Sequence, residues 1–105
     1  MSLNITINKD ELKEEIKEEI KPPPLYKVIM LNDDFTTMDF VIQVLMNVFH
    51  KSADEAEQIM LTIHYQGRGV CGVYPKDIAQ TRIQQVHLLA RAEQHPLKCI
   101  MEPVS

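Results

Sequence analysis

Four polar residues have side chains that could do chemistry: Asn32, Asp33 and Asp34 in a row, and His64 further along the chain. Carboxylates with a histidine can act as acid and base in a hydrolase, or hold a metal ion. The chain has no Gly-rich phosphate loop, GxSxG elbow or HExxH pair, and the four residues lack a recognisable metal-ligand spacing. Taken alone, Asn-Asp-Asp is typical of a turn, and His64 of an imidazole at a helix end. No motif therefore supports a catalytic or metal site.

The two cysteines are the other candidates for reactivity. Cys71 and Cys99 lie too far apart for a CxxC redox or zinc motif, and neither has a histidine beside it in the sequence. Both lie in apolar alternating stretches, which predicts buried free thiols. His50, His87 and His95 match no binding motif and are predicted to be surface or helix-end residues.

The elements around the Asn-Asp-Asp segment can be predicted from its flanks. Residues 25–31 are apolar and rich in strand formers, so we expect a buried strand that ends in a turn. Thr36 with Asp39 three residues later resembles a capping box, and apolar residues then recur at helical spacing through about His50. A helix with one broad core face is therefore expected after the turn.

The remaining chain contains two more helices and two more strands. Ser52 and Glu55 repeat the cap signature, and the second helix should stop at Gly67. Residues 68–74 alternate weakly as a strand, and Pro75 opens a third helix. Pro96 ends that helical region, and a last strand is expected over residues 97–101.

The predicted order is therefore β-α-α-β-α-β. It indicates a small α+β domain, with a three-stranded, mainly antiparallel sheet covered by three helices on one face. A chain of 105 residues has room for one such domain.

The first 24 residues differ in kind from the rest. Residues 9–21 carry six acids and four lysines with a narrow apolar stripe, and three prolines follow at 22–24. This composition predicts a flexible charged arm at residues 1–24, ending in a Pro spacer, ahead of a core domain at residues 25–105.

Composition also bears on partners and location. The formal net charge is −4 and the 11 basic residues are scattered, which argues against nucleic acid as a partner. No apolar run approaches the roughly 20 residues that span a bilayer, and the start of the chain lacks a secretory apolar core. We therefore expect a cytoplasmic protein with no membrane association.

Three separated motifs together resemble one family. The stretches LYKVIMLNDDFTTMDFVIQVL, IMLTIHYQGRGVCGVY and QHPLKC are similar, in order and almost without gaps, to the bacterial N-degron adaptor family ClpS, from about Lys21 to the C-terminus. The resemblance implies an α+β domain with a flexible arm, and a non-enzymatic monomeric adaptor without cofactor or metal. ClpS proteins deliver substrates to the AAA+ unfoldase ClpA of the ClpAP protease, and the arm is needed for that delivery.

The resemblance also implies residue roles. Asn32, Asp33, Asp34 and His64 would surround the free α-amino group of a substrate, and their oxygens and imidazole nitrogen are suitable acceptors for an ammonium group. The first side chain, Leu, Phe, Tyr or Trp, would enter a pocket lined by Thr36, Thr37, Met38, Val41, Met60, Ile63 and Leu97.

Three further positions follow from the same resemblance. Met38 resembles the methionine that excludes Ile and Val, and Thr37 departs from a proline common in relatives. Asp77 and Arg82 match positions thought to face the unfoldase.

Two readings from other classes remain open at this point. One is a small hydrolase or metal-dependent enzyme that uses Asp33, Asp34 and His64. The other is a structural interaction domain resembling the C-terminal domain of the ribosomal stalk protein, which would show no preference for a free α-amine.

Overall fold

The computed structural model describes residues 21–105, and the first 20 residues of the predicted arm lie outside the described part. Residues 21–24 are exposed and form no helix or strand. The elements after them follow the predicted order, with β1 (Leu25–Leu31), α2 (Met38–Asn47), α3 (Ala53–Gln66), β2 (Arg68–Pro75), α4 (Lys76–Ala92) and β3 (Lys98–Pro103).

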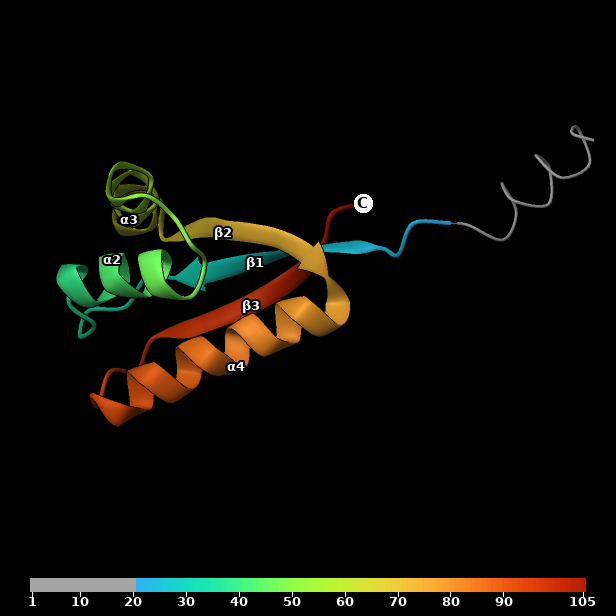
Figure 1. Ribbon diagram of the computed structural model, residues 1–105. Helices are drawn as coiled ribbons and strands as arrows, with labels where there is room; N and C mark the ends of the chain where they lie inside the picture. The colour runs from blue at the N-terminus through green and yellow to red at the C-terminus, as the bar shows by residue number, and fades with distance from the viewer. Residues whose placement is uncertain (1–20) are drawn as a thin grey trace, which may run out of the picture.

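The three strands form one antiparallel sheet in the order β2-β1-β3 (Figure 1). Val28, Ile29 and Met30 of the central strand are almost completely buried, as expected for a strand with a neighbour on each side. At the end of β1, Leu31 pairs with Arg68 of β2 and with Lys98 of β3. The sheet therefore holds the end of β1 between the starts of β2 and β3.

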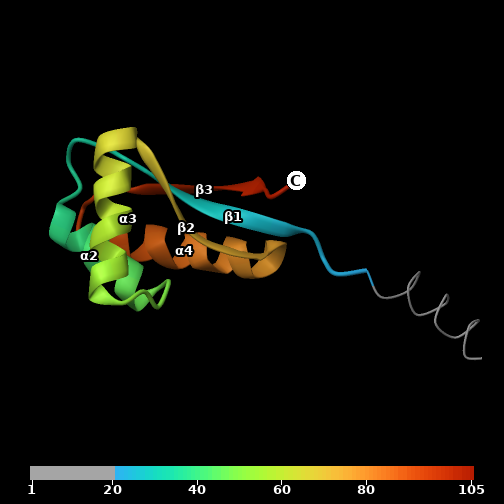
Figure 2. The same cartoon turned by 90° about the horizontal axis from the view of Figure 1, so that it is seen from above.

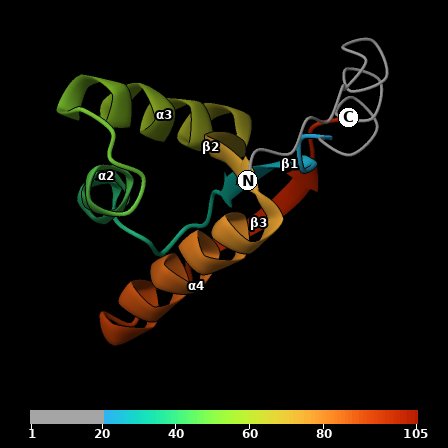
Figure 3. The same cartoon turned by 45° about the vertical axis from the view of Figure 1, so that its right-hand side comes forward.

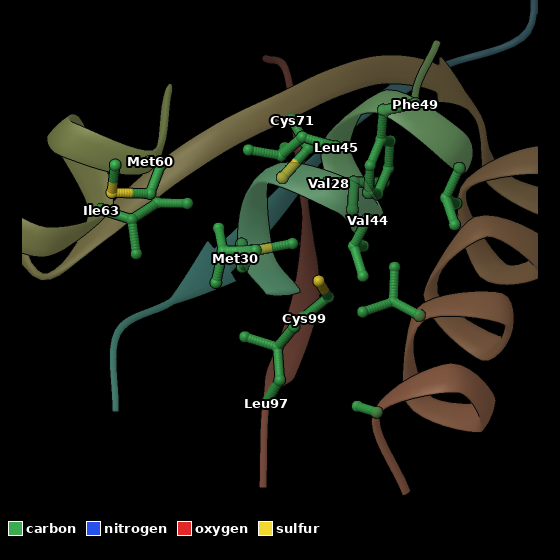
Figure 4. Close-up of a cluster of buried hydrophobic side chains, with 14 of the residues drawn as sticks. Val28, Met30, Val44, Leu45, Phe49, Met60, Ile63, Cys71, Leu97 and Cys99 are labelled. Carbon is green, nitrogen blue, oxygen red and sulfur yellow. The ribbon is translucent and has the colours of Figure 1, made fainter. Parts of the chain in front are cut away.

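The helices supply the other layer of the core. α4 runs along the sheet, whereas α2 and α3 lie together at the end where β1 stops (Figures 1 and 2), and Figure 3 shows all three helices on one side of the sheet. Val28 and Met30, which alternate along β1, belong to the central apolar cluster, part of which is drawn in Figure 4. The predicted α+β fold is confirmed.

The start of the first helix differs from the prediction. Its N-cap is Thr37, whose hydroxyl accepts from the N–H of Phe40 at 3.2 Å, and not Thr36 paired with Asp39. The Thr36 hydroxyl instead donates to Asp33 Oδ2 at 2.7 Å, within the turn that precedes the helix. The helix also ends at Asn47, three residues before the predicted His50.

The second helix follows its local signals closely. Ser52 and Glu55 form the predicted capping box, in which each side chain accepts from the other residue's N–H. Gly67 stops the helix with a φ of 88°, a left-handed conformation that glycine adopts without steric cost. The last strand begins at Lys98 and reaches Pro103, so it lies slightly later than predicted.

Both cysteines are buried free thiols, as predicted. Hydrogen bonding with Cys71 and burial raise the pKa of the Cys99 thiol far above its ordinary value. Cys99 is therefore protonated at neutral pH, which argues against it as a nucleophile.

No helix among residues 21–105 is long and apolar enough to cross a bilayer.

Candidate functional site

A cavity of about 230 Å³ lies where the end of β1 meets α2 and α3. Its wall is made by residues from three places in the sequence, namely the segment after β1, the first two turns of α2 and the C-terminal half of α3. The lining residues are Asn32, Asp33, Asp34, Thr36, Met38, Val41, Met60, Ile63 and His64. All nine belong to the two sets that the family resemblance predicted.

Backbone contacts explain why His64 meets the Asn-Asp-Asp segment. The N–H of Asn32 donates to the carbonyl oxygen of Gly67 at 2.9 Å, continuing the pairing of Leu31 with Arg68. The N–H of Gly67 in turn donates to the carbonyl of Ile63 at 2.9 Å, which closes the end of α3. The last turn of α3, which contains His64, is thereby joined directly to the residue that follows β1.

Asp33 closes the turn itself. Its Oδ1 accepts from the N–H groups of Phe35 at 2.8 Å and Thr36 at 2.6 Å, and its Oδ2 accepts from the Thr36 hydroxyl. Burial acts to raise the pKa of the Asp33 carboxyl, but these hydrogen bonds, helped by the charge of His95, hold the pKa below its ordinary value. Asp33 is therefore an anion whose oxygens are already used by the loop.

The side chains of Asn32, Asp34 and His64 are free for a ligand. All three residues are exposed, and within residues 21–105 their side chains make no hydrogen bond. The His64 ring lies 5.0 Å from the ring of Tyr65 in an edge-to-face arrangement, which restricts its orientation. Three acceptors are thus unpaired at the mouth of the cavity, with the Asp33 charge beside them.

The other end of the cavity is apolar. Val41, Met60 and Ile63 are less than a tenth exposed and belong to the central core, whereas Met38 is 47% exposed. A Cβ added to Gly69 of β2 would lie 2.7 Å from Cγ1 of Ile63, so the glycine allows Ile63 to pack closely against the sheet. Three of the four apolar residues of the wall therefore belong to the core, and Met38 is the exposed one.

Two predicted pocket residues do not line this cavity. Thr37 uses its hydroxyl to cap α2, and Leu97 is 1% exposed within the core. Of the predicted unfoldase pair, Asp77 is exposed in the first turn of α4. The guanidinium of Arg82 lies 6.0 Å from the centre of the Tyr74 ring, and its buried Nε has no hydrogen-bond partner among residues 21–105.

One neighbour of the site was missed by the sequence analysis. The ring of His95 lies 4.5 Å from that of Phe40 in the first turn of α2, and His95 is close enough to Asp33 for its charge to act on the carboxylate. No local pattern around His95 predicts this, since the contact spans more than 50 residues of sequence. The bond from the N–H of Phe35 to Asp33, by contrast, has the two-residue spacing of an Asx turn.

The chemistry of this site suits binding. Its wall has no serine, cysteine or lysine as a nucleophile, and in the described part of the chain no three His, Cys, Asp or Glu side chains are grouped to hold a metal ion. A cavity with unpaired acceptors at one end and a core-like apolar wall at the other fits a ligand that carries a cation next to an apolar group.

Comparison with known proteins agrees with this geometry. Residues 21–100 match the family model of the ATP-dependent Clp protease adaptor protein ClpS. The chain is 58% identical over 82 residues to the ATP-dependent Clp protease adapter proteins ClpS of Nitrosospira multiformis and Aromatoleum aromaticum, and each match covers 78% of this chain and 80% of the relative.

A solved structure gives the same result. The structure of Agrobacterium tumefaciens ClpS2 bound to L-phenylalaninamide superposes with a TM-score of 0.76 at 40% identity, covering 78% of this chain and 99% of that one. The chain therefore belongs to the ClpS family of ATP-dependent Clp protease adaptors.

Proposed function

We propose that this adaptor binds proteins that begin with Leu, Phe, Tyr or Trp and delivers them to a ClpA-type AAA+ unfoldase for degradation by ClpP. The free α-amino group is bound by Asn32, Asp34 and His64, next to the charge of Asp33. The first side chain is bound at the apolar end of the cavity. The observation that carries the proposal is one cavity with unpaired acceptors at its mouth and core residues as its wall.

The polar end matches an α-ammonium group in number and kind. An ammonium offers three donors and no acceptor, and the amide oxygen, the carboxylate and the neutral imidazole nitrogen at this mouth are all acceptors. Hydrogen bonds to a charged group contribute about 1.5–3 kcal/mol each. Acetylation removes both the charge and two of the donors, so an acetylated substrate should lose most of this energy.

The apolar end is large enough for the first side chain. A dry cavity of about 150 Å³ accommodates a benzene molecule, and the cavity here, about 230 Å³, also includes the polar mouth. Burying a Leu or Phe side chain contributes about 1.5–3 kcal/mol. Together with the amine contacts, this supports affinities near the micromolar range, which needs about 8 kcal/mol.

L-phenylalaninamide, which the Agrobacterium relative binds, supports the same division of the site. It has a free α-amine next to a phenylalanine side chain, and nothing else that is charged. At 40% identity and with the same fold, we infer that this chain holds a comparable ligand in the corresponding cavity.

Delivery is assigned to parts of the chain outside the cavity. The arm at residues 1–24 would serve delivery, with the core domain at residues 25–105 serving recognition, and Asp77 and Arg82 on α4 would face the unfoldase. The protein would act as a cytoplasmic monomer without catalysis, metal or cofactor.

The recognition step can be tested by titrating three labelled peptides that share one sequence after the first residue. A peptide that begins with Leu should bind near the micromolar range, while its N-acetylated form and an Ile-initiated form should each bind at least about ten-fold more weakly. Asp34→Ala should weaken the Leu peptide, whereas Asp54→Ala, an exposed aspartate at the start of α3 that does not line the cavity, should not. Equal affinity for all three peptides would rule out the proposed recognition.

A further inference from the structure

The segment between β1 and α2, which forms the polar end of the cavity, is held in position by contacts with other parts of the domain. We name residues 32–37 the recognition loop, which has no helix or strand. Phe35 at its tip is 78% exposed, so this aromatic side chain does not anchor the loop to the core. The bonds of Asp33 close the turn only within the loop. The position of the loop on the domain must therefore depend on other contacts.

His95 provides such a contact at the α2 end of the loop. Its ring lies 4.5 Å from the Phe40 ring at an interplanar angle of 48°, and its side chain is 17% exposed. The N–H of Phe40 is the one that Thr37 caps, so His95 packs on the turn where the loop becomes helix. His95 therefore supports the recognition loop at its C-terminal end, through the first turn of α2.

Arg91 holds His95 in place. Its Nη1 donates to the carbonyl oxygens of His95 at 2.7 Å and Leu97 at 2.9 Å, which fastens the connection between α4 and β3. That connection includes Gln94, whose φ of 61° is a left-handed conformation that costs energy for a residue with a side chain. Backbone bonds from the N–H of Gln94 to Arg91 and from the N–H of His95 to Ala90 shape this connection, and the two Arg91 side-chain bonds fasten it further.

We propose that His95 and Arg91 are positioning residues for the recognition loop, and that they raise its affinity for the substrate amine without touching the substrate. Neither residue lines the 230 Å³ cavity. Both line a separate groove, together with Phe35, Gln94 and Pro96. The proposal rests on the proposed function, because it concerns how the amine site is held in its binding geometry.

The test uses the full chain with His95→Ala, His95→Phe and Arg91→Ala. His87→Ala is the matched control, since it removes a histidine of α4 and one contact to β3, the 3.0 Å bond from the N–H of Cys99 to Nε2, and His87 makes no hydrogen bond to the loop. For each variant, the affinity for the free-amine Leu peptide, the urea midpoint, and the hydrogen exchange of the Phe35 and Thr36 amides are measured.

His95→Ala should weaken the Leu peptide about three- to ten-fold, the order expected when one aromatic pair is lost. Exchange of the two loop amides should rise more than exchange in β1. Arg91→Ala should do the same, and His95→Phe, which keeps a ring against Phe40, should stay within about two-fold of the parent in affinity. His87→Ala should lower the urea midpoint and leave the affinity unchanged.

Several results overturn the proposal while leaving the proposed function intact. They are unchanged affinity in His95→Ala, an equal loss in His87→Ala, or a loss in His95→Phe as large as that in His95→Ala. If His95→Ala fails to fold, the comparison of Arg91→Ala with His87→Ala decides in the same way. If the parent protein binds the free-amine and acetylated peptides equally, the proposed function fails and the positioning role fails with it.

Discussion

Asp33 and Asp34 are adjacent aspartates that both line the cavity, yet the structure gives them different roles. Asp33 accepts three hydrogen bonds from Phe35 and Thr36, whereas the Asp34 side chain accepts none within the described residues. Asp33→Ala leaves three donors of the loop without their acceptor, so it should destabilise the domain as well as the site. Asp34→Ala is the matched control, because it removes the same charge from the next position.

The expected loss of stability in Asp33→Ala can be estimated from the known cost of removing helix caps. Removing a side chain that caps backbone N–H groups costs about 0.5–2 kcal/mol, and the partial exposure of Asp33 limits the contribution of its charge. We therefore expect Asp33→Ala to lower the free energy of unfolding by about 1–2 kcal/mol, or roughly 1 M in the urea midpoint. Asp34→Ala should stay within about 0.5 kcal/mol of the parent.

Binding separates the two aspartates from any general loss of stability. Asp34→Ala should weaken a Leu-initiated peptide at unchanged stability, while Asp33→Ala should lower both affinity and stability. Asp33→Asn keeps an oxygen for the two backbone donors, so it should lie between the parent and Asp33→Ala in urea unfolding. Equal destabilisation by Asp33→Ala and Asp34→Ala would refute the role of Asp33 in closing the loop.

Asp33 should also make the stability of the domain depend on pH. The pKa of Asp33 in the folded protein lies below its ordinary value of 3.8, so the folded state favours the anion more than the unfolded state does. The stabilisation from Asp33 is therefore complete above about pH 5 and is lost as pH falls below about 4 and through the folded pKa. The stability difference between the parent and Asp33→Asn should shrink over that acidic range, and a constant difference would contradict the assignment.

Three further predictions concern other residues of the site. His64→Ala removes one acceptor for the substrate amine, so it should weaken a Leu-initiated peptide without lowering the urea midpoint, and an unchanged affinity would count against the role of His64. Thr37→Ala should lower the free energy of unfolding by about 0.5–2 kcal/mol in urea, because α2 loses its cap, while peptide affinity measured by titration changes less than two-fold. A loss of affinity without a loss of stability would show that Thr37 lines the pocket. Gly69→Ala should force Ile63 to shift, which should lower the free energy of unfolding by about 1–3 kcal/mol and weaken a Phe-initiated peptide more than a Leu-initiated one. Equal affinities in parent and variant would show that Ile63 does not move into the cavity.

Most elements could be predicted because their signals are local. A change from apolar to polar residues marks the end of the strand over residues 25–31. A capping box marks the start of α3, and a left-handed glycine marks its end. Each of these signals acts between residues a few positions apart, where backbone geometry alone decides the outcome. The family motifs then predicted nine residues that line one cavity.

Local signals failed where two neighbours competed for one role. Thr36 and Thr37 are chemically identical, and the pattern with Asp39 favoured Thr36 as the cap of α2. In the structure the Thr36 hydroxyl donates to Asp33, and Thr37 caps the helix. The choice depends on how the loop folds, which the spacing of two threonines cannot report.

The sequence by itself thus determined the order of the elements, the boundaries of β1 and α3, and the residue types at the site. Only the tertiary structure decided that Asn32 is bonded to Gly67, which brings His64 to the amine acceptors, and that His95 packs on Phe40 behind them. Those contacts join residues more than 30 positions apart. They form because sheet pairing and core packing place distant segments together, so no periodicity or cap within one segment can encode them.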